Sequence, residues 1–531
     1  MRFLTSLILL FLSLSSFAQA PDIIFQNTVG GDDWEFVRDF IQSSDGGYVL
    51  VGDSRSNASF DKSENNIGSD DIWVVKLDNT GALEWENTIG GTLRDLALGV
   101  EEAANGEFIV AGWTASPVSG DITEPILGGS DCFIFKLNSS GEFVWQKYIG
   151  GDGFDSASSI QKLSNGNFLI GALSNSDISG EKTENGYGEN DFWVFEIDTN
   201  GDIIWQKTVG AALNDVLYDA VETPDGSIIL MGSSNSPISG DKTEDPIGTS
   251  GREDYWAIKL DTDRNVVWDN TVGGDFVEGI RGGIGTADNG CLIIGWSLSD
   301  ASGDKSEDVI GDLERADYWV IKLNADGSVA WENTIGGDST DNGWAAIQLA
   351  DGSFVIGGES SSDISGDKDE DTDFIDIWIL GLNPDGEIQW QNTIGGDNAE
   401  YLYGNFILNE SGNLVMAGST SSAVSGDVTD GANEGHDYWI VEMGEPPILV
   451  TENTTDVSLQ LYPNPSSEAV NLRASTQIDE IIIYNALGQF IQKLSPQSDK
   501  VQLDVSNFSS GLYYANIKIG AATSTKAFII D

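Results

Sequence analysis

Short apolar runs alternate with turn residues through most of the chain, and the pattern returns about every sixty residues. In one copy, residues 342–349 and 353–358 form two such runs, a polar loop follows, and residues 377–382 and 387–394 form two more. Asp-Gly turns separate the runs of each pair, which is a strong hairpin signal. A fixed period of this length indicates one structural unit that is copied and stacked. The pattern therefore predicts four antiparallel strands per repeat.

The last strand of each repeat begins with an aromatic residue and is followed by Gly-Gly or, once, by Gly-Ala. The seven copies begin at Phe25, Trp85, Trp145, Trp205, Trp268, Trp331 and Trp390, at spacings of 60, 60, 60, 63, 63 and 59 residues. The first copy precedes every other strand, whereas the last repeat, 397–444, stops after its third strand. The N-terminal strand can therefore complete the last repeat and cover open sheet edges. We expect an all-β fold with a seven-bladed β-propeller of four-stranded blades over residues 22–444, in which the N-terminal strand closes the last blade.

Tryptophan follows the same repeat. Of the sixteen tryptophans, twelve fall at two positions, the start of the fourth strand and the third strand. Large aromatic side chains at repeated positions are typical of packing between blades. The four tryptophans outside this pattern, Trp34, Trp113, Trp296 and Trp344, are candidates for stacking against a sugar or a base.

The two ends of the chain differ from the repeats. A positive start, an apolar run to residue 17 and small residues after it are typical of a secretory signal peptide. We expect this signal peptide at residues 1–18, with cleavage after residue 20 as an alternative. No later stretch has the apolar length of a membrane helix, so no membrane span is predicted. Residues 445–457 form a polar linker, and residues 458–531 predict a small C-terminal β-sandwich.

The C-terminal domain carries short motifs in a fixed order. They contain Tyr462, Pro463, Asn464 and Pro465, then Gly488, then Gly511, Leu512 and Tyr513, and finally Lys526. With these motifs, residues 458–531 resemble the type A C-terminal sorting domain of the Bacteroidetes type IX secretion system, and the chain resembles secreted repeat β-propeller proteins of that group. The resemblance implies that the type IX secretion machinery is a partner and that the protein lies outside the cell or on the outer-membrane surface. An ordinary carbohydrate-binding sandwich is the alternative, because alternating strands and Gly-rich turns fit both.

Composition narrows the possible functions. The formal net charge of −61 argues against nucleic acid and anionic membranes as partners, since both require a basic surface. Cys132 and Cys291 lie in different repeats, so a disulfide framework is not expected. The sole histidine, His436, argues against Ser-His-Asp and Cys-His catalysis and against multi-histidine zinc sites. We therefore expect that the protein is not an enzyme. We also expect a monomer.

An acidic residue follows the second residue of the Gly-Gly pair by four positions in every repeat, and we call these residues the turn acids. They are Glu35, Asp95, Asp155, Asp215, Glu278, Asp341 and Glu400. Seven such carboxylates could line a central channel. Alternatively, each could accept backbone N–H groups of the tight turn between blades.

Further acidic residues recur around the long loop of each repeat: two loop acids three positions apart, and a strand acid that precedes the third strand. In the fourth to sixth repeats they are Asp241, Glu244, Asp254, Asp304, Glu307, Asp317, Asp367, Glu370 and Asp376. Clustered oxygen ligands suit Ca²⁺, so these nine residues are candidate ligands and Ca²⁺ is the only candidate cofactor. Alternatively, Asp-x-x-Glu is a helix capping box, and the loop could hold one helical turn.

Three functions remain. The first is a non-catalytic binding or adhesion module for an extracellular glycan or protein, because loops on a rigid scaffold commonly carry function. The second is a carboxylate-based glycan hydrolase or lyase, which needs two unlike carboxylates across a cleft. The third is a calcium-stabilised structural repeat protein.

Overall fold

The structure is a computed structural model that describes residues 18–248, 252–311 and 315–447, and towards the C-terminus residues 460–462, 465–466, 469–485, 490–506, 508–509, 511–519 and 522–530. Contacts divide the chain into two compact units, Met1–Ile448 and Leu449–Asp531. Residues 1–17 of the predicted signal peptide and residues 448–457 of the predicted linker lie outside the described residues. Ala18, the last residue of the predicted signal peptide, is described, and its backbone N–H donates to the carbonyl of Gln389 at 2.9 Å.

The first unit consists of short antiparallel strands, and the only helical element in its described part is the 3₁₀ turn η1 (Ala104–Gly106). Six of its sheets have four strands in sequence order. These sheets are β2 (Glu35–Gln42), β3 (Tyr48–Ser54), β4 (Asp71–Leu77) and β5 (Leu83–Ile89); β6 (Asp95–Glu102), β7 (Phe108–Thr114), β8 (Asp131–Leu137) and β9 (Phe143–Ile149); β10 (Asp155–Lys162), β11 (Phe168–Ser174), β12 (Asp191–Ile197) and β13 (Ile203–Val209); β14 (Asp215–Glu222), β15 (Ile228–Ser234), β16 (Asp254–Leu260) and β17 (Val266–Val272); β18 (Glu278–Gly285), β19 (Cys291–Ser297), β20 (Asp317–Leu323) and β21 (Val329–Ile335); and β22 (Asp341–Gln348), β23 (Phe354–Ser360), β24 (Asp376–Leu382) and β25 (Ile388–Ile394). The predicted four-stranded repeat is confirmed.

The seventh sheet joins the two ends of this unit. Its strands β28 (Leu414–Thr420) and β29 (Asp437–Met443) lie between β1 (Ile23–Val29) and two short segments, β26 (Glu400–Tyr401) and β27 (Phe406–Leu408). β1 pairs with β29 in antiparallel register, in which Thr28 lies opposite Trp439. As predicted, the N-terminal strand supplies the outer strand that the last repeat lacks.

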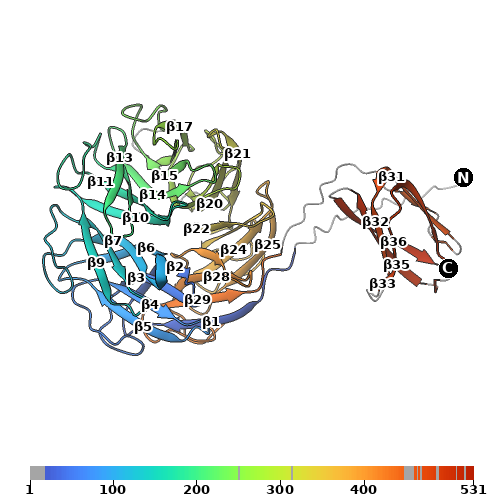
Figure 1. Cartoon of the computed structure of the whole chain (residues 1–531), viewed down its shortest axis with the longest axis horizontal. Helices are drawn as coiled ribbons and strands as arrows, with labels where there is room; N and C mark the ends of the chain where they lie inside the picture. The colour runs from blue at the N-terminus through green and yellow to red at the C-terminus, as the bar shows by residue number, and fades with distance from the viewer. Residues whose placement is uncertain are drawn as a thin grey trace, which may run out of the picture. The chain divides into compact units, whose positions relative to one another are not determined.

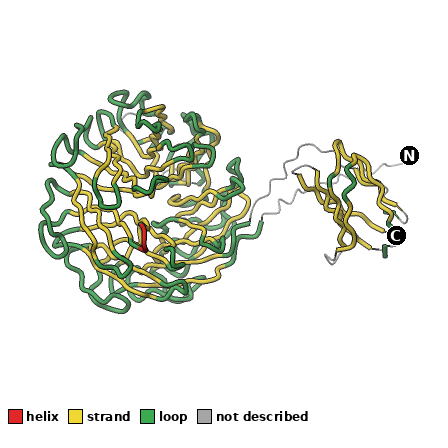
Figure 2. The backbone as a smooth tube through the Cα atoms, in the orientation of Figure 1, coloured by secondary structure: helices red, strands yellow, loops and turns green. Residues whose placement is uncertain are grey.

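The sheets follow one another around a common centre. In Figure 1, β2, β6, β10, β14 and β22 lie towards the middle of the unit, and β5, β9, β13 and β17 lie at its rim. Figure 2 shows strands filling the body of the unit and loops gathered around its edge. The long loops, such as 55–70, and the Gly-Gly turns lie at the end of the sheets where the inner strands begin, which we call the loop face.

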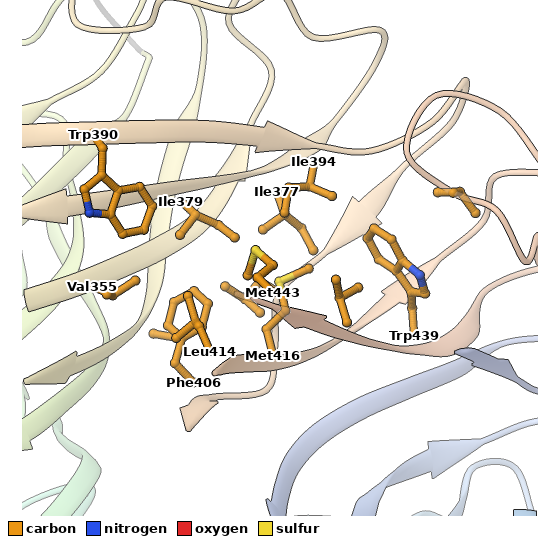
Figure 3. Packing of buried hydrophobic residues seen from close by; sticks show 14 of the residues in the cluster. Val355, Ile377, Ile379, Trp390, Ile394, Phe406, Leu414, Met416, Trp439 and Met443 are labelled. Carbon is orange, nitrogen blue, oxygen red and sulfur yellow. The ribbon is translucent and has the colours of Figure 1, made fainter. Parts of the chain in front are cut away.

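Third-strand tryptophans fill the space between neighbouring sheets. Trp73, Trp193, Trp256, Trp319, Trp378 and Trp439 are all fully buried. Between the sixth and seventh sheets, Ile377, Ile379 and Trp390 pack with Met416 and Trp439 (Figure 3). An aromatic side chain of this size buries about 150–250 Å². The predicted packing role of the repeated tryptophans is confirmed.

The seventh sheet also packs against the first. Val37 and Trp73 share one buried cluster with Val415 and Tyr438. The Tyr438 hydroxyl donates to the Trp73 carbonyl at 3.1 Å, across 365 residues of sequence. Sheets from the two ends of the unit are therefore neighbours in space.

The second unit contains two antiparallel sheets. One is made of β30 (Gln460–Tyr462), β31 (Ala469–Ile478) and β34 (Ser498–Asp504), and the other of β33 (Phe490–Leu494), β32 (Glu480–Asn485), β35 (Gly511–Ile519) and β36 (Ala522–Ile530). Leu472 from the first sheet shares a buried cluster with Ile483, Ala515 and Phe528 from the second. In neither unit do the described residues include a helix that is long and apolar enough to cross a membrane.

Deletion of residues 19–30 removes β1 and leaves the edge of β29 unpaired. We expect the melting temperature to fall by roughly 10 °C or more, because each 1 kcal/mol corresponds to about 2–4 °C in a domain of moderate size. Differential scanning calorimetry measures this change. Deletion of residues 460–531 is the control, since they belong to the other compact unit. An unchanged first-unit transition after loss of β1 would contradict its closing role.

Candidate ligand-binding site

The turn acids are buried within the turns that connect neighbouring sheets. In a representative turn, Oδ2 of Asp95 accepts the N–H of Gly91 at 2.7 Å and the hydroxyl of Ser116 at 2.9 Å. The equivalent N–H bond forms at Glu35, Asp155, Asp215, Asp341 and Glu400. These carboxylates therefore satisfy backbone donors of the turn, which is the second of the two predicted arrangements.

The loop acids also bind backbone N–H groups. Oδ2 of Asp241 accepts the N–H of Gly210 at 3.2 Å, and Oε2 of Glu244 accepts that of Thr271 at 2.9 Å. The same two bonds form at Asp304 and Glu307, and at Asp367 and Glu370. The loop acids thus fasten the long loop to the last strand of its own sheet and to the turn that precedes that sheet.

The loop itself forms a tight bridge, as between Ser239 and Lys242, and its described residues contain no helical turn. The capping-box alternative is therefore wrong, because the two acids reach a strand and a turn instead of a helix end. Lys242 is buried, lies 4.9 Å from the ring centroid of Trp256 and donates to Thr271 Oγ1 at 2.5 Å. Five repeats place a buried lysine here: Lys62, Lys182, Lys242, Lys305 and Lys368.

Each strand acid faces the turn acid of the next sheet, and the two form a buried carboxyl pair. A Cβ on Gly90 would stand 2.2 Å from Asp71 Oδ1 and 2.9 Å from Asp95 Oδ2. The first glycine of the Gly-Gly pair is therefore needed because only glycine leaves room for both carboxyl groups. Within the described part of the chain, Oδ1 has no hydrogen-bond partner in any of the strand acids, Asp71, Asp131, Asp191, Asp254, Asp317, Asp376 and Asp437.

Burial favours the protonated form of the strand acids. It is the main cause that raises the pKa of Asp71 and Asp191 to about 6, of Asp317 and Asp376 to about 7, and of Asp254 and Asp437 to about 8. The neighbouring Glu278 carboxylate adds to the rise at Asp254. Two close carboxyl groups resist double ionisation, so each pair retains protons at a pH where free carboxyl groups are ionised.

The nine candidate calcium ligands fall into two groups that make different contacts. Their six loop acids bind backbone N–H groups, and Asp254, Asp317 and Asp376 belong to carboxyl pairs. The described residues contain no group of three or more acidic, histidine or cysteine side chains arranged to hold a metal ion. In these three repeats a buried lysine, such as Lys242 beside Asp215 and Asp254, supplies positive charge. Calcium binding stays a prediction.

A second set of repeated positions faces the centre of the first unit. In β2 the register with β3 shifts by one residue between Val37 and Asp39, and the same bulge occurs in β6, β10, β14, β18 and β22. A β-bulge re-aims the extra residue. These residues are Arg38, Leu98, Ser158, Tyr218, Arg281 and Trp344, and Tyr403 takes the same place between β26 and β27. We call the seven residues the bulge ring.

All seven residues of the bulge ring line one cavity of about 380 Å³. This volume is near the lower end of the range of small-molecule sites, about 300–1,000 Å³. In five of the six bulged pairs a glycine opposite the bulge permits a close approach: a Cβ on Gly358 would stand 1.9 Å from the carbonyl oxygen of Asn342. Ala172 takes this place in the third sheet. The cavity therefore arises from the backbone geometry that all the repeats share.

One side of the cavity is rich in polar groups. Nη1 of Arg281 donates to the Tyr218 hydroxyl at 3.2 Å, and its guanidinium lies 4.9 Å from the Trp344 ring centroid. Burial raises the pKa of Glu359 to about 7, and the charge of Arg281 opposes this rise. Arg281 Nε, Trp344 Nε1 and Glu359 Oε1 are buried and have no hydrogen-bond partner among the described residues. Arg281 and Trp344 line the cavity, and since buried polar atoms are normally bonded, their two donors indicate a place for a polar ligand.

Aromatic rings lead from this side of the cavity to the loop face. Ring centroids lie 4.7 Å apart for Trp344 and Tyr403, 5.2 Å for Tyr403 and Tyr401, 5.3 Å for Tyr401 and His436, and 5.6 Å for His436 and Trp34. Phe36 packs 5.1 Å from His436. Trp34 is 44% exposed. We call these six residues the aromatic track.

The four tryptophans outside the repeat pattern share one feature, an arginine over the ring. The guanidinium-to-centroid distances are 5.3 Å for Arg55 and Trp34, 5.7 Å for Arg94 and Trp113, 6.0 Å for Arg281 and Trp296, and 4.9 Å for Arg281 and Trp344. Of the four, only Trp344 lines the cavity, and Trp34 ends the aromatic track.

Sequence reasoning missed the bulge ring, because the strand pattern does not reveal which residue is extra in a bulged pair. One signal was present. Glycines inside the second strands, at 52, 112, 232, 295, 358 and 418, mark a bulge or a close backbone approach.

The predicted sorting residues are only partly described. Tyr462 is 48% exposed, and Pro465 and Lys526 are also exposed. Tyr513 is buried, and its hydroxyl donates to the Ser509 carbonyl at 2.9 Å. Gly511 and Leu512 open β35. Pro463, Asn464 and Gly488 lie outside the described residues.

The carboxyl pairs predict a stability that depends on pH. Their folded pKa values lie above the usual aspartate value, so their stabilising contribution is present at acidic pH and is lost as the pH rises through about 6 to 8. We expect the melting temperature to fall between pH 5 and pH 8.5. Asp254→Asn, which cannot ionise, should reduce this fall by about 2 °C or more in calorimetry.

Asp261→Asn is the matched control. Asp261 lies, partly exposed, in the turn between β16 and β17, and the backbone N–H of Asn265 holds its pKa below the usual range, so it is ionised throughout this window. Its substitution should leave the pH slope unchanged. A pH slope that is identical in the Asp254 variant and the native chain would contradict the carboxyl-pair interpretation.

Millimolar EDTA tests the calcium hypothesis. We expect the melting temperature at pH 7.5 to stay constant, because the loop acids bind backbone donors and buried lysines supply the positive charge in five repeats. A fall of several degrees that added Ca²⁺ reverses would instead establish calcium binding.

Known proteins resemble parts of the chain. A regulatory protein FlaEY of Caulobacter vibrioides is 27% identical over 223 residues, which cover 40% of this chain and 23% of that protein. β-Agarase A of Zobellia galactanivorans is 31% identical over 83 residues, 15% of each chain. The chain thus matches less than a quarter of the length of either relative.

Among solved structures, Sqt1 from Chaetomium thermophilum is 10% identical with a TM-score of 0.41, and the match covers 81% of this chain and all of that one. PorZ, a surface component of the type IX secretion system of Porphyromonas gingivalis, is 10% identical with a TM-score of 0.25, over 96% of this chain and 75% of that one.

The family match concerns the second unit. Residues 460–531 match the family described as the secretion system C-terminal sorting domain. This span contains all the motifs on which the resemblance was based, from Tyr462 to Lys526. The chain therefore ends in a type IX secretion system C-terminal sorting domain, which directs its export to the cell surface or the extracellular space.

Proposed function

We propose that the first unit is a closed seven-bladed β-propeller that acts as a non-catalytic binding module for an extracellular glycan or protein. Two observations support closure: one cavity is lined by residues from all seven repeats, and the seventh sheet packs against the first. The ligand enters the cavity of the bulge ring. The sorting domain delivers this monomeric module to the outside of the cell through the type IX machinery.

The observation that carries this proposal is the variety of the bulge ring. The turn acids and strand acids are acidic in all seven repeats, whereas the bulge position changes among Arg, Leu, Ser, Tyr and Trp. A position with only a packing role keeps a similar size and polarity, since interiors are closely packed. Different side chains around one cavity instead provide the few polar groups and apolar faces of a ligand site.

A second candidate function is a carboxylate-based glycan hydrolase or lyase. Asp39 and Asp219 line the same cavity, and burial raises the pKa of Asp39 to about 7 and of Asp219 to about 6. A raised pKa suits a general acid. However, each of these carboxylates accepts a backbone N–H of the next inner strand at 2.9 Å, from Val100 and from Gly283. These bonds favour a structural role for both.

Hydrolysis assays with polysaccharides distinguish the two functions. We expect the chain from residue 19 onward to release no reducing ends. Release that is lost in both Asp39→Asn and Asp219→Asn would favour the enzyme.

A binding screen tests the proposed site. We expect the chain from residue 19 onward to bind at least one extracellular glycan or surface protein, and Arg281→Ala and Trp344→Ala to weaken that binding by about tenfold or more, because buried Arg and Trp are typical hot spots. Lys147→Gln is the control, since Lys147 lies on the outer strand β9 in an exposed ion pair with Asp202. Isothermal titration calorimetry gives the affinities. Equal affinities in all variants would contradict a site in the bulge ring.

A further inference from the structure

The polar side of the cavity and the aromatic track meet at Trp344 and Tyr403, and we propose that together they bind the end of a neutral polysaccharide chain. The terminal sugar lies in the bulge ring, and the following sugars lie along the track as far as Trp34. This inference rests on the proposed function and specifies its ligand.

The terminal sugar is matched by the unpartnered groups of the cavity. Arg281 Nε and Trp344 Nε1 are donors, and both residues line the cavity. The hydroxyl oxygens of a sugar accept such bonds, so adjacent hydroxyl groups of one sugar ring can satisfy both donors. The edge-to-face pair of Trp344 and Tyr403, 4.7 Å apart, adds apolar surface for the C–H groups of the ring.

The following sugars are matched by the continuity of the track. Its rings contact one another at centroid distances of 4.7 to 5.6 Å, so they form an unbroken row from Trp344 to Trp34. Trp34, at its outer end, is 44% exposed and is available to a chain that leaves the cavity. The track also has a polar component, because Nδ1 of His436 is buried and has no partner among the described residues. A linear glycan that enters by one end fits this arrangement.

The charges favour a neutral glycan over an acidic one. The charge of Arg38 is neutralised by Asp53 at 2.8 Å, and Arg281 is close enough to Glu359 to affect its pKa. The formal net charge of −61 repels a polyanion during approach. Both local and long-range electrostatics therefore select against uronate chains.

The experiment compares chain lengths. The chain from residue 19 onward is titrated with neutral oligosaccharides from disaccharide to hexasaccharide, taken from glucan, mannan and galactan series, and with uronate oligosaccharides of the same lengths. Trp344→Ala and Trp34→Ala are tested in parallel. Trp113→Ala is the matched control, because Trp113 also lies outside the repeat pattern beneath an arginine, Arg94, but does not belong to the track. Melting temperatures verify that each variant is folded.

We expect one neutral series to bind with an affinity that increases with chain length. Trp344→Ala should lower the affinity about tenfold or more at every length, because it removes the terminal subsite. Trp34→Ala should leave the disaccharide affinity unchanged and abolish the gain from longer chains. Trp113→Ala should match the native chain at all lengths.

The outcomes separate this inference from the proposed function. If Trp344→Ala abolishes the binding of a protein partner while no neutral oligosaccharide binds, the glycan inference is wrong and the binding site stands. Tighter binding of uronate than of neutral chains overturns the inference in the same way. If glycans bind but Trp344→Ala and Arg281→Ala have no effect, the proposed site is wrong as well.

Discussion

A buried pair of carboxyl groups at every Gly-Gly turn constrains how one sheet follows the next. The turn acid binds the N–H of the second glycine, and the strand acid of the preceding sheet lies against it across the first glycine. Because a side chain on that glycine would collide with both carboxyl groups, this position of the turn requires glycine. The same turn fixes where the inner strand begins, and the bulge follows three residues later, as from Asp95 to Leu98. The geometry at the centre of the unit thus depends on a contact at the loop face.

The carboxyl pairs show that much of the acidity of the chain has a structural role. A formal charge of −61 counts every carboxyl group as ionised, yet burial holds the pKa of several strand acids between about 6 and 8. The loop acids satisfy backbone donors, such as the N–H of Thr271. Many of the repeated acidic residues therefore hold the loop face together, and their abundance is not evidence for a cation ligand.

The candidate site combines a backbone geometry that the repeats share with side chains that differ from repeat to repeat. Every inner strand has the same kind of bulge or interruption, but only part of the ring offers the chemistry of a ligand site. Arg281, Trp344 and Tyr403 come from neighbouring sheets, and the track continues through Tyr401 to Trp34 beside the first sheet. The opposite side has the small or apolar residues Leu98 and Ser158. One side of the cavity is thus polar and aromatic, which gives a ligand a single orientation.

The sequence by itself determined the repeat, its four strands, the exchange of the N-terminal strand, the packing role of twelve tryptophans and the sorting domain, because alternation, turn residues and motif order are local properties of the chain. It left open whether the turn acids face a channel, since burial depends on neighbouring sheets. It did not identify the bulge ring or the aromatic track. The residues of the track, from Trp34 to His436, are separated by up to 402 positions in the chain, and only the meeting of the first and last sheets brings them together. Which side chains share a cavity was therefore decided by the tertiary structure, because it alone fixes distances between residues that are remote in sequence.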